Sequence, residues 1–212
     1  MKNKKLLFTI AGVAVLGMVA ILMTGARQSG WRHGDDRMSL PAPTVHASHA
    51  LRLMDARLST KSFDGTREID EQTLSNILWA AWGMNSRGTR TIPTAGNRQD
   101  MSLYAVTPYG AYLYDAANNH LIEITDEDLR PVFARQGFVM DAYLTLVFVG
   151  RDVHNATLHA GSSYQNVSLY AAEIGLGAVV RGMFDRAEAA AALGIGEDEQ
   201  VITTMTVGWP QN

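Results

Sequence analysis

Two cations and a hydroxyl occupy alternate positions in the segment Arg57-Leu58-Ser59-Thr60-Lys61-Ser62-Phe63. In an extended chain, alternate side chains point to the same side, so Arg57, Ser59 and Lys61 would form one polar row. Such a row suits an elongated anionic ligand, because guanidinium and ammonium groups both bind anionic oxygens. An exposed strand edge can carry the same pattern, so the segment alone leaves both interpretations open.

A second segment with possible binding chemistry is Thr91-Ile92-Pro93-Thr94-Ala95-Gly96-Asn97-Arg98-Gln99. Its small residues would let the backbone approach a planar ligand closely. The side-chain amides of Asn97 and Gln99 would supply both hydrogen-bond donors and acceptors. An ordinary surface loop can have this composition too.

The chain offers no self-contained set of catalytic side chains. His46 and His49 lie three residues apart, and His154 and His159 five apart, without convincing acidic partners. We interpret them as surface or linker histidines and expect no metal site, because zinc motifs need more ligands at tighter spacing. The sequence contains no Gly-x-Ser-x-Gly elbow, P-loop or dinucleotide Gly-x-Gly-x-x-Gly motif. An enzyme built on this chain would therefore rely on a cofactor.

Length and composition limit the class of protein. The chain has 212 residues, 47% of them hydrophobic and 18% charged, with a formal net charge of −3. The hydrophobic fraction excludes a disordered chain, and the mild acidity argues against nucleic-acid binding. Because there is no cysteine, disulfides, thiolate metal sites and thiol nucleophiles are excluded. Lys61 is the only lysine beyond residue 5.

The N-terminus has the pattern of an export signal. Three lysines within the first five residues precede the uncharged run Leu6 to Met23, followed by Thr24-Gly25-Ala26. Residues 1–26 are therefore predicted to be a signal peptide cleaved after Ala26 or an uncleaved membrane anchor, with a buried core helix as the third alternative. Export would place the rest in the periplasm or another extracytoplasmic space, and an uncleaved anchor would attach it to the inner membrane. Residues 27–46 are predicted to be a linker, and 47–212 a folded domain.

The elements that must position these residues alternate irregularly. Asp70 is predicted to cap a helix whose apolar residues fall on one face and which Gly83 stops. Further elements are expected as strands at 103–106, 111–114, 120–124, 143–149, 178–180 and 200–207, and as helices at 162–174 and 186–193. Hairpins mixed with flanking helices indicate an α+β fold.

Several short motifs follow one another over roughly residues 40–210. They are Arg57-x-Ser59-x-Lys61-x-Phe63, the helix 74–83, Arg90 to Gln99, Leu103-Tyr104, Gly110 to Asp115, Gln165 to Ala172, Glu173 to Gly177, Val180 to Asp185 and Val207-Gly208-Trp209-Pro210. In this order they resemble the FMN-dependent nitroreductase superfamily, and specifically its SagB/thiazoline-oxidase-like dehydrogenase branch. Each motif alone is a weak indication of the family, but the occurrence of all of them in this order is specific.

The resemblance implies a central, mainly antiparallel sheet flanked by helices, in a homodimer whose interface holds FMN. Arg57 and Ser59 would hold the phosphate and the ribityl chain. Lys61 would lie near N1 and the C2 carbonyl, where a cation stabilises the negative charge of the reduced flavin. No residue is singled out as catalytic beyond this electrostatic role, since the flavin carries the chemistry.

Two more segments complete the implied cofactor site. Five residues of the second segment would line the ring or the ribityl chain: Pro93, Thr94, Ala95, Asn97 and Gln99. The backbone at Val180, Arg181 and Gly182 would face the flavin edge near N5.

The sequence departs from the family pattern in two ways. Family members usually end with a basic residue that clamps the phosphate, whereas this sequence stops at Gln211-Asn212. Arg90, Arg98 or Arg181 would have to compensate, or FMN would bind weakly. Thiazoline-oxidase members are also associated with a catalytic lysine and tyrosine. This chain has no second lysine beyond residue 5 besides Lys61, so azoline oxidation is disfavoured.

The expected function is that of an exported FMN-dependent oxidoreductase. It would move a hydride between flavin N5 and a small nitroaromatic, quinone-like or other substrate. Nicotinamide cofactors are not expected outside the cytoplasm, so the electron donor stays open. The alternative is a non-catalytic or degenerate flavin-binding dimer module.

Overall fold

A computed structural model describes residues 40–211 of the protein. Contacts divide the chain after Pro43, and the unit that follows begins at Thr44. The predicted signal peptide or anchor at 1–26, and the predicted linker as far as residue 39, lie outside the described residues. No helix within residues 40–211 is long and apolar enough to cross a membrane.

A single six-stranded sheet forms the centre of the unit that begins at Thr44. Its strands are β1 (Met101–Thr107), β2 (Gly110–Asp115), β3 (His120–Thr125), β4 (Leu144–Gly150), β5 (Gly177–Arg181) and β6 (Gln200–Gly208). Their order is β3-β2-β1-β4-β6-β5, and every neighbouring pair is antiparallel. Strand β4 is buried along its whole length, as its continuous apolar run predicts. The predicted α+β fold with an antiparallel sheet is confirmed.

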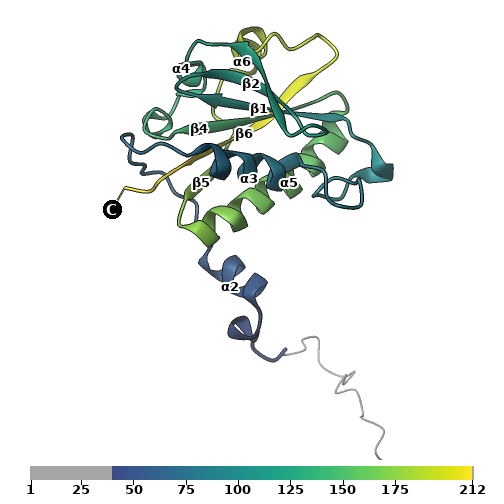
Figure 1. Ribbon diagram of the computed structural model, residues 1–212, viewed down its shortest axis with the longest axis vertical. Coiled ribbons are helices and arrows are strands. Elements are labelled where there is room, and N and C mark those ends of the chain that lie inside the picture. The colour runs from purple at the N-terminus through teal and green to yellow at the C-terminus, as the bar shows by residue number, and fades with distance from the viewer. Residues whose placement is uncertain (1–39, 212) are drawn as a thin grey trace, which may run out of the picture. The chain divides into compact units, whose positions relative to one another are not determined.

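Helices cover both faces of this sheet (Figure 1). The α-helices are α2 (His49–Ala56), α3 (Glu71–Trp82), α4 (Arg130–Phe133), α5 (Val153–Ile174) and α6 (Arg186–Ala192), and short 3-10 helices lie at Val45–Ala47, Ala95–Asn97 and Gly137–Val139. Alternation along β1 separates two cores, since Leu103 and Ala105 pack with α3 and α5, whereas Tyr104 and Val106 pack with α4 and α6. The larger core therefore lies under α3 and α5.

Two helices differ from the sequence prediction. α3 begins and ends as predicted, because the Asp70 side chain accepts a hydrogen bond from the Thr73 N–H and Gly83 follows the last turn. α5 begins at Val153 rather than near Ser162, since Asp152 caps it and its first two turns mix apolar with polar residues, which weakens the apolar period. α2 was not predicted, and none of its residues is buried.

Candidate functional site

The polar row Arg57, Ser59 and Lys61 lies on a segment that extends the sheet at β5. Ser59 forms a parallel bridge with Ala178, and the Thr60 N–H donates to the Ala178 carbonyl at 3.1 Å. The predicted extended conformation is thus supplied by pairing with the edge strand. Gly177 permits this approach, because a Cβ there would lie 2.7 Å from Cγ2 of Thr60.

The far end of the same segment is held by residues that follow β6. Phe63 forms an antiparallel bridge with Pro210, and the Gln211 N–H donates to the Ser62 carbonyl at 3.1 Å. The Ser62 hydroxyl also donates to Oε1 of Gln211 at 3.0 Å. The segment is therefore fixed on both sides of Lys61.

A pocket of about 480 Å³ opens where the polar row meets the end of β5. It is lined by Lys61, Gln136, Val179, Val180, Arg181, Gly182 and Met183. Four predicted cofactor residues, Lys61 and Val180 to Gly182, are therefore brought together although 119 positions separate the first two. Arg57 and Ser59 precede Lys61 on the same extended segment but do not line this pocket.

Arg181 is the buried cation of the pocket, since its residue surface is only 4% exposed. Its Nε donates to the Thr206 hydroxyl at 2.7 Å, and its Nη1 donates to the Phe133 carbonyl at 2.9 Å. Both partners are neutral, and the buried Nη2 has no partner among the described residues. Burial lowers the pKa of Arg181 to about 10, so the side chain remains a cation at neutral pH.

The predicted binding loop is anchored by a histidine on α5. The Ala95 N–H donates to Nε2 of His159 at 3.1 Å, and Nδ1 of His159 lies 2.9 Å from Oδ1 of Asp100, close but not aligned as a well-formed hydrogen bond. Gly96 and Asn97 follow with left-handed φ angles of 58° and 55°. The interpretation of His159 as a surface or linker histidine is wrong, because the residue is only 2% exposed.

The beginning of this loop is held by α3 and α5 together. The Asn166 side-chain amide donates to the carbonyls of Ala80 at 3.1 Å and Thr91 at 3.4 Å. The Thr91 hydroxyl donates to the Trp79 carbonyl at 3.0 Å. Pro93, Ala95, Asn97 and Gln99 are exposed and Thr94 is half-buried, so the loop presents a firmly based but open surface.

A signal for His159 is present in the sequence. Five small or branched residues lie three or four positions apart on the buried face of α5: Ala156, Ala160, Ser163, Val167 and Ala171. His159 lies three positions after Ala156 and four before Ser163, so the same period places it on this face. A histidine on that face is expected to have buried partners, and here they are the loop and Asp100.

The predicted cofactor residues form two groups at opposite ends of α5. Ser59 is paired beside Ala178, just beyond Gly175, where α5 ends, whereas the loop is bound to His159 near its beginning. At 1.5 Å per residue, the stretch of helix from His159 to Gly175 is about 24 Å long. A single chain therefore does not bring both groups to one small ligand.

Two arginines considered as phosphate ligands are engaged elsewhere. Nη1 of Arg90 donates to the Trp82 carbonyl at 2.8 Å, and the guanidinium lies 4.4 Å from the centre of the Trp82 ring. Nη1 of Arg98, which is exposed, lies 3.7 Å from the Asp152 carboxylate. Of the three arginines, Arg181 is the one that lines the pocket beside Lys61.

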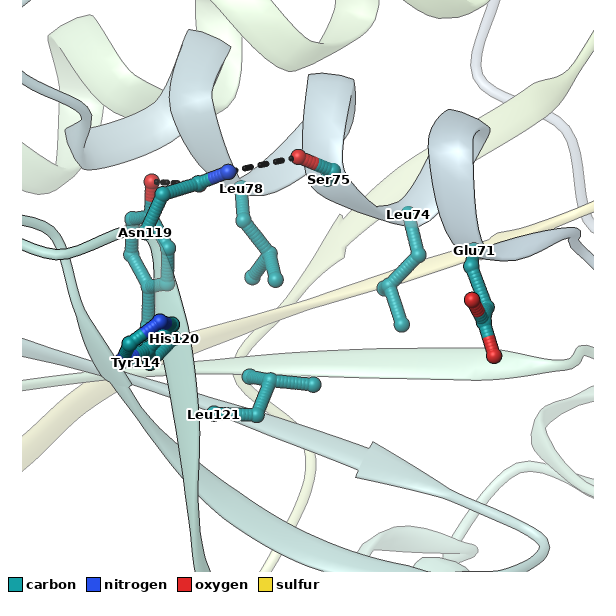
Figure 2. A pocket seen from close by; sticks show the side chains of 8 residues that line it. All are labelled: Glu71, Leu74, Ser75, Leu78, Tyr114, Asn119, His120 and Leu121. Carbon is teal, nitrogen blue, oxygen red and sulfur yellow. Dashed lines mark hydrogen bonds between the residues drawn. The ribbon is translucent and has the colours of Figure 1, made fainter.

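A separate pocket of about 320 Å³ lies between α3 and the β2–β3 hairpin (Figure 2). Asn119 closes one end, since it accepts a hydrogen bond from the Tyr114 hydroxyl at 2.8 Å and its amide donates to Ser75 at 3.0 Å. Leu74, Leu78 and Leu121 give it apolar walls, and Glu71 lies at the other end. None of the predicted cofactor residues lines it.

Comparison with known proteins agrees with this architecture. The family model described as the nitroreductase family matches residues 54–209. A solved structure of a protein from Ralstonia eutropha, named for the same family, has a TM-score of 0.72 and 31% identity, covering 85% of this chain and 88% of that one. A protein of Methanocaldococcus jannaschii, also named a nitroreductase, is 26% identical over 171 residues, which cover 70% of this chain and 86% of the relative.

A more distant likeness shows the fold alone. The Escherichia coli microcin synthetase McbBCD complex, with truncated pro-MccB17 bound, contains a chain with a TM-score of 0.70 and 15% identity. The match covers 92% of this chain and 82% of that one. The family model spans more than half of the sequence, and the Ralstonia structure exceeds 30% identity over most of both chains. The chain therefore belongs to the nitroreductase family.

Proposed function

We propose that this protein is an FMN-dependent oxidoreductase acting on a small substrate. The observation that carries the proposal is the pocket at the end of β5, which combines Lys61 and Arg181 with the backbone of Gly182 and has no carboxylate among its described lining residues. A cationic pocket suits a flavin, which becomes anionic when reduced. A Cβ at Gly182 would meet no heavy atom within 4 Å, so its backbone is open to a ligand.

The residues of this chain would bind and orient the cofactor. Arg57 and Ser59 would hold the phosphate and the ribityl chain, and Lys61 would lie near N1 and the C2 carbonyl. When bound, FMN supplies the capacity to accept and donate a hydride at N5. The backbone of Val180 to Gly182 would face that edge, and the protein would exclude water around it.

The proposed site needs a second copy of the chain. The polar row and the loop lie beside opposite ends of α5, whose stretch from His159 to Gly175 is about 24 Å long. A symmetric homodimer would let one copy's row and the other copy's loop contact the same flavin. Apolar side chains are exposed near both groups, Leu58 at 75% and Leu158 at 56%. An apolar interface of this kind is typical of stable homodimers.

The branch, the location and the substrate are finer parts of the proposal. The motif order supports the SagB-like branch, and the microcin synthetase likeness supports the shared fold of that branch. The N-terminal charge and apolar pattern supports export, with or without a membrane anchor. A nitroaromatic or quinone-like acceptor is proposed as the substrate class. A non-catalytic flavin-binding module is the rival proposal.

The visible spectrum of the purified full chain tests the proposal. A flavin spectrum, or one that develops on titration with FMN, is expected, and a protein that stays colourless would refute it. Anaerobic photoreduction followed by menadione or a nitroaromatic then separates enzyme from binding module. Prompt reoxidation supports the enzyme, whereas no reoxidation supports the module.

The phosphate assignment is tested with a matched pair of variants. Arg57→Ala should weaken FMN binding about tenfold or more, because it removes a charge-assisted contact with a phosphate. Arg87→Ala removes an exposed arginine from the turn after α3 and should leave FMN binding unchanged. Equal dissociation constants for the two variants would reject the assignment.

A further inference from the structure

Strand β3 is an edge of the sheet, because within the described residues it pairs with β2 alone. Five of its six residues are exposed and the sixth is half-buried, unlike those of the other strands. Three of them are large and apolar, with Leu121 37%, Ile122 50% and Ile124 39% exposed. Edge strands of soluble proteins often carry lysine or proline, which hinder pairing with another chain, and β3 contains neither. This edge is therefore open to a further strand.

The apolar side chains of β3 lie on both faces of the edge. Leu121 pairs in register with Tyr114, and both line the pocket of about 320 Å³ under α3 (Figure 2). Ile122 pairs with Leu113, which packs in the smaller core with α4 and α6. An added strand would alternate its side chains in the same way. One of them would enter the pocket beside Leu74 and Leu121, and the next would cover Ile122.

This surface also carries negative charge. Glu71 lies at one end of the pocket, and Glu123 lies two residues after Leu121 on the same face of β3. Asp126 and Glu127 follow directly after the strand and are exposed. None of these four carboxylates forms an ion pair with another residue that the structure describes. The charge therefore favours a partner with a basic side chain.

The arginines close to this surface are already engaged. Nη2 of Arg130 lies 2.7 Å from the Asp128 carboxylate, and Nη1 of Arg90 donates to the Trp82 carbonyl at 2.8 Å. Of the described residues that line the pocket, only His120 can carry a positive charge. The acidic residues are thus left to attract a cation from outside the chain.

The spacing of these groups sets an order for the side chains of the partner. Leu121 and Glu123 lie where β3 pairs with β2 in regular register, about 7 Å apart along the strand. Residues i and i+2 of an added strand have the same separation. Every neighbouring pair in this sheet is antiparallel, and in that direction the residue opposite Glu123 comes two positions before the residue opposite Leu121. A lysine or arginine followed two positions later by a large apolar residue matches both.

We propose that β3 is a docking edge for an extended segment of a partner protein that carries a basic residue two positions before a large apolar one. Backbone hydrogen bonds to the edge would supply affinity, the apolar side chain would fill the pocket, and the basic one would pair with Glu123. A second copy of this chain fits less well, since the acidic residues of both edges would be brought together. The inference goes beyond the proposed flavin chemistry and does not depend on it.

Binding of short synthetic peptides to the full chain, followed by fluorescence polarisation, tests the proposal. The probe is fluorescein-labelled Gly-Thr-Lys-Val-Leu-Thr-Thr-Gly. One comparison peptide has glutamate in place of the lysine, and the other exchanges the positions of lysine and leucine. The probe should bind about fivefold more tightly than either, because both lose the ion pair with Glu123. Absence of saturable binding up to about 1 mM, or equal affinity for the three peptides, would overturn the proposal.

A charge reversal at Glu123 identifies the contact. Glu123→Lys should weaken binding of the probe about fivefold or more and tighten that of the glutamate peptide, because attraction and repulsion exchange places. Glu197→Lys makes the same change of charge at an exposed position after α6 and should alter neither dissociation constant. The proposal is wrong if Glu123→Lys leaves both dissociation constants at their wild-type values.

Amide hydrogen exchange locates the bound peptide. With the probe bound, amides of β3 that face away from β2 should exchange more slowly, and those of β5 should be unaffected. Protection at β5 without protection at β3 would contradict docking at this edge. Sedimentation of the free protein checks the other occupant: if Ile122→Lys alone converts a dimer to monomers, a second copy occupies β3 and the proposal is overturned.

Discussion

Replacing His159 by leucine tests how the loop Thr91 to Gln99 is held. The ring nitrogens of His159 are 3.1 Å from the Ala95 nitrogen and 2.9 Å from the Asp100 carboxylate. Leucine has a similar apolar bulk but neither nitrogen, so the Ala95 N–H loses its acceptor and Asp100 loses its neighbour. Each buried polar group left without a partner costs about 1–3 kcal/mol.

Two groups lose a partner, so the full cost would be about 2–6 kcal/mol, and we expect the loss of stability to lie near the lower end of that range. Ala95 is exposed, so water can replace the lost acceptor there, whereas the Asp100 side chain is only 18% exposed and recovers less. We therefore expect the free energy of unfolding to fall by about 2 kcal/mol. With a urea m-value near 3 kcal/mol/M, the midpoint should fall by roughly 0.7 M.

Urea unfolding followed by tryptophan fluorescence measures this change, and His154→Leu is the matched control. His154 lies on the same helix but is exposed, and a surface substitution usually changes stability by less than about 0.5 kcal/mol. If His159→Leu shifts the midpoint no more than His154→Leu does, the loop is not anchored by this histidine. In that case α5 does not fix the loop position through His159.

Two further substitutions test the packing that positions the candidate site. Gly177→Ala should lower the free energy of unfolding by about 1–3 kcal/mol in thermal melts, because the new Cβ would lie 2.7 Å from a side-chain carbon of the segment 57–63. Gly161→Ala, inside α5, is the comparison, because no heavy atom lies closer than 3.7 Å to the new Cβ. It should raise the free energy of unfolding by up to about 1 kcal/mol. A change of the same sign in both glycine variants would contradict the close approach at Gly177. Ser163→Ala should cost about 1–2 kcal/mol, since its buried hydroxyl donates at 2.6 Å to a carbonyl of α3. Ser162→Ala, whose hydroxyl bonds only within its own helix, is the comparison, and equal melting temperatures for the two serine variants would show that this bond between helices adds nothing.

Much of the fold could be predicted from local patterns. The alternation and turn residues of the β1–β2 hairpin, the apolar run of β4 and the Asp70 cap each determine an element by short-range chemistry. The first turns of α5 were missed, although the capping residue Asp152 and the periodic small residues from Ala156 onwards are present in the sequence. They are held by a cap at Asp152 and by tertiary contacts such as that of His159.

The candidate site was predictable only in part. The spacing of Arg57, Ser59 and Lys61 indicated an extended row, and the row is extended, but nothing in the spacing indicated β5 as its partner. The sequence also did not indicate that the row and the loop lie far apart, since their separation depends on the length of α5. The burial of Arg181 follows from its position on β5, where the alternating face meets Phe133 and Thr206.

The way in which the segment 57–63 joins the sheet has a consequence for its motion. It is held to β5 and to the residues after β6 by isolated bridges rather than by a continuous ladder, and the Ser59–Ala178 bridge joins positions 119 residues apart. Phe63 is buried and keeps the end of the segment in place, whereas the part that precedes it is held to β5 by one bridge and can open while the six strands remain paired. Amide hydrogens of the segment should then exchange with solvent much faster than those of β4. Local opening of this edge is a route by which a flat molecule could enter the pocket without unfolding of the core.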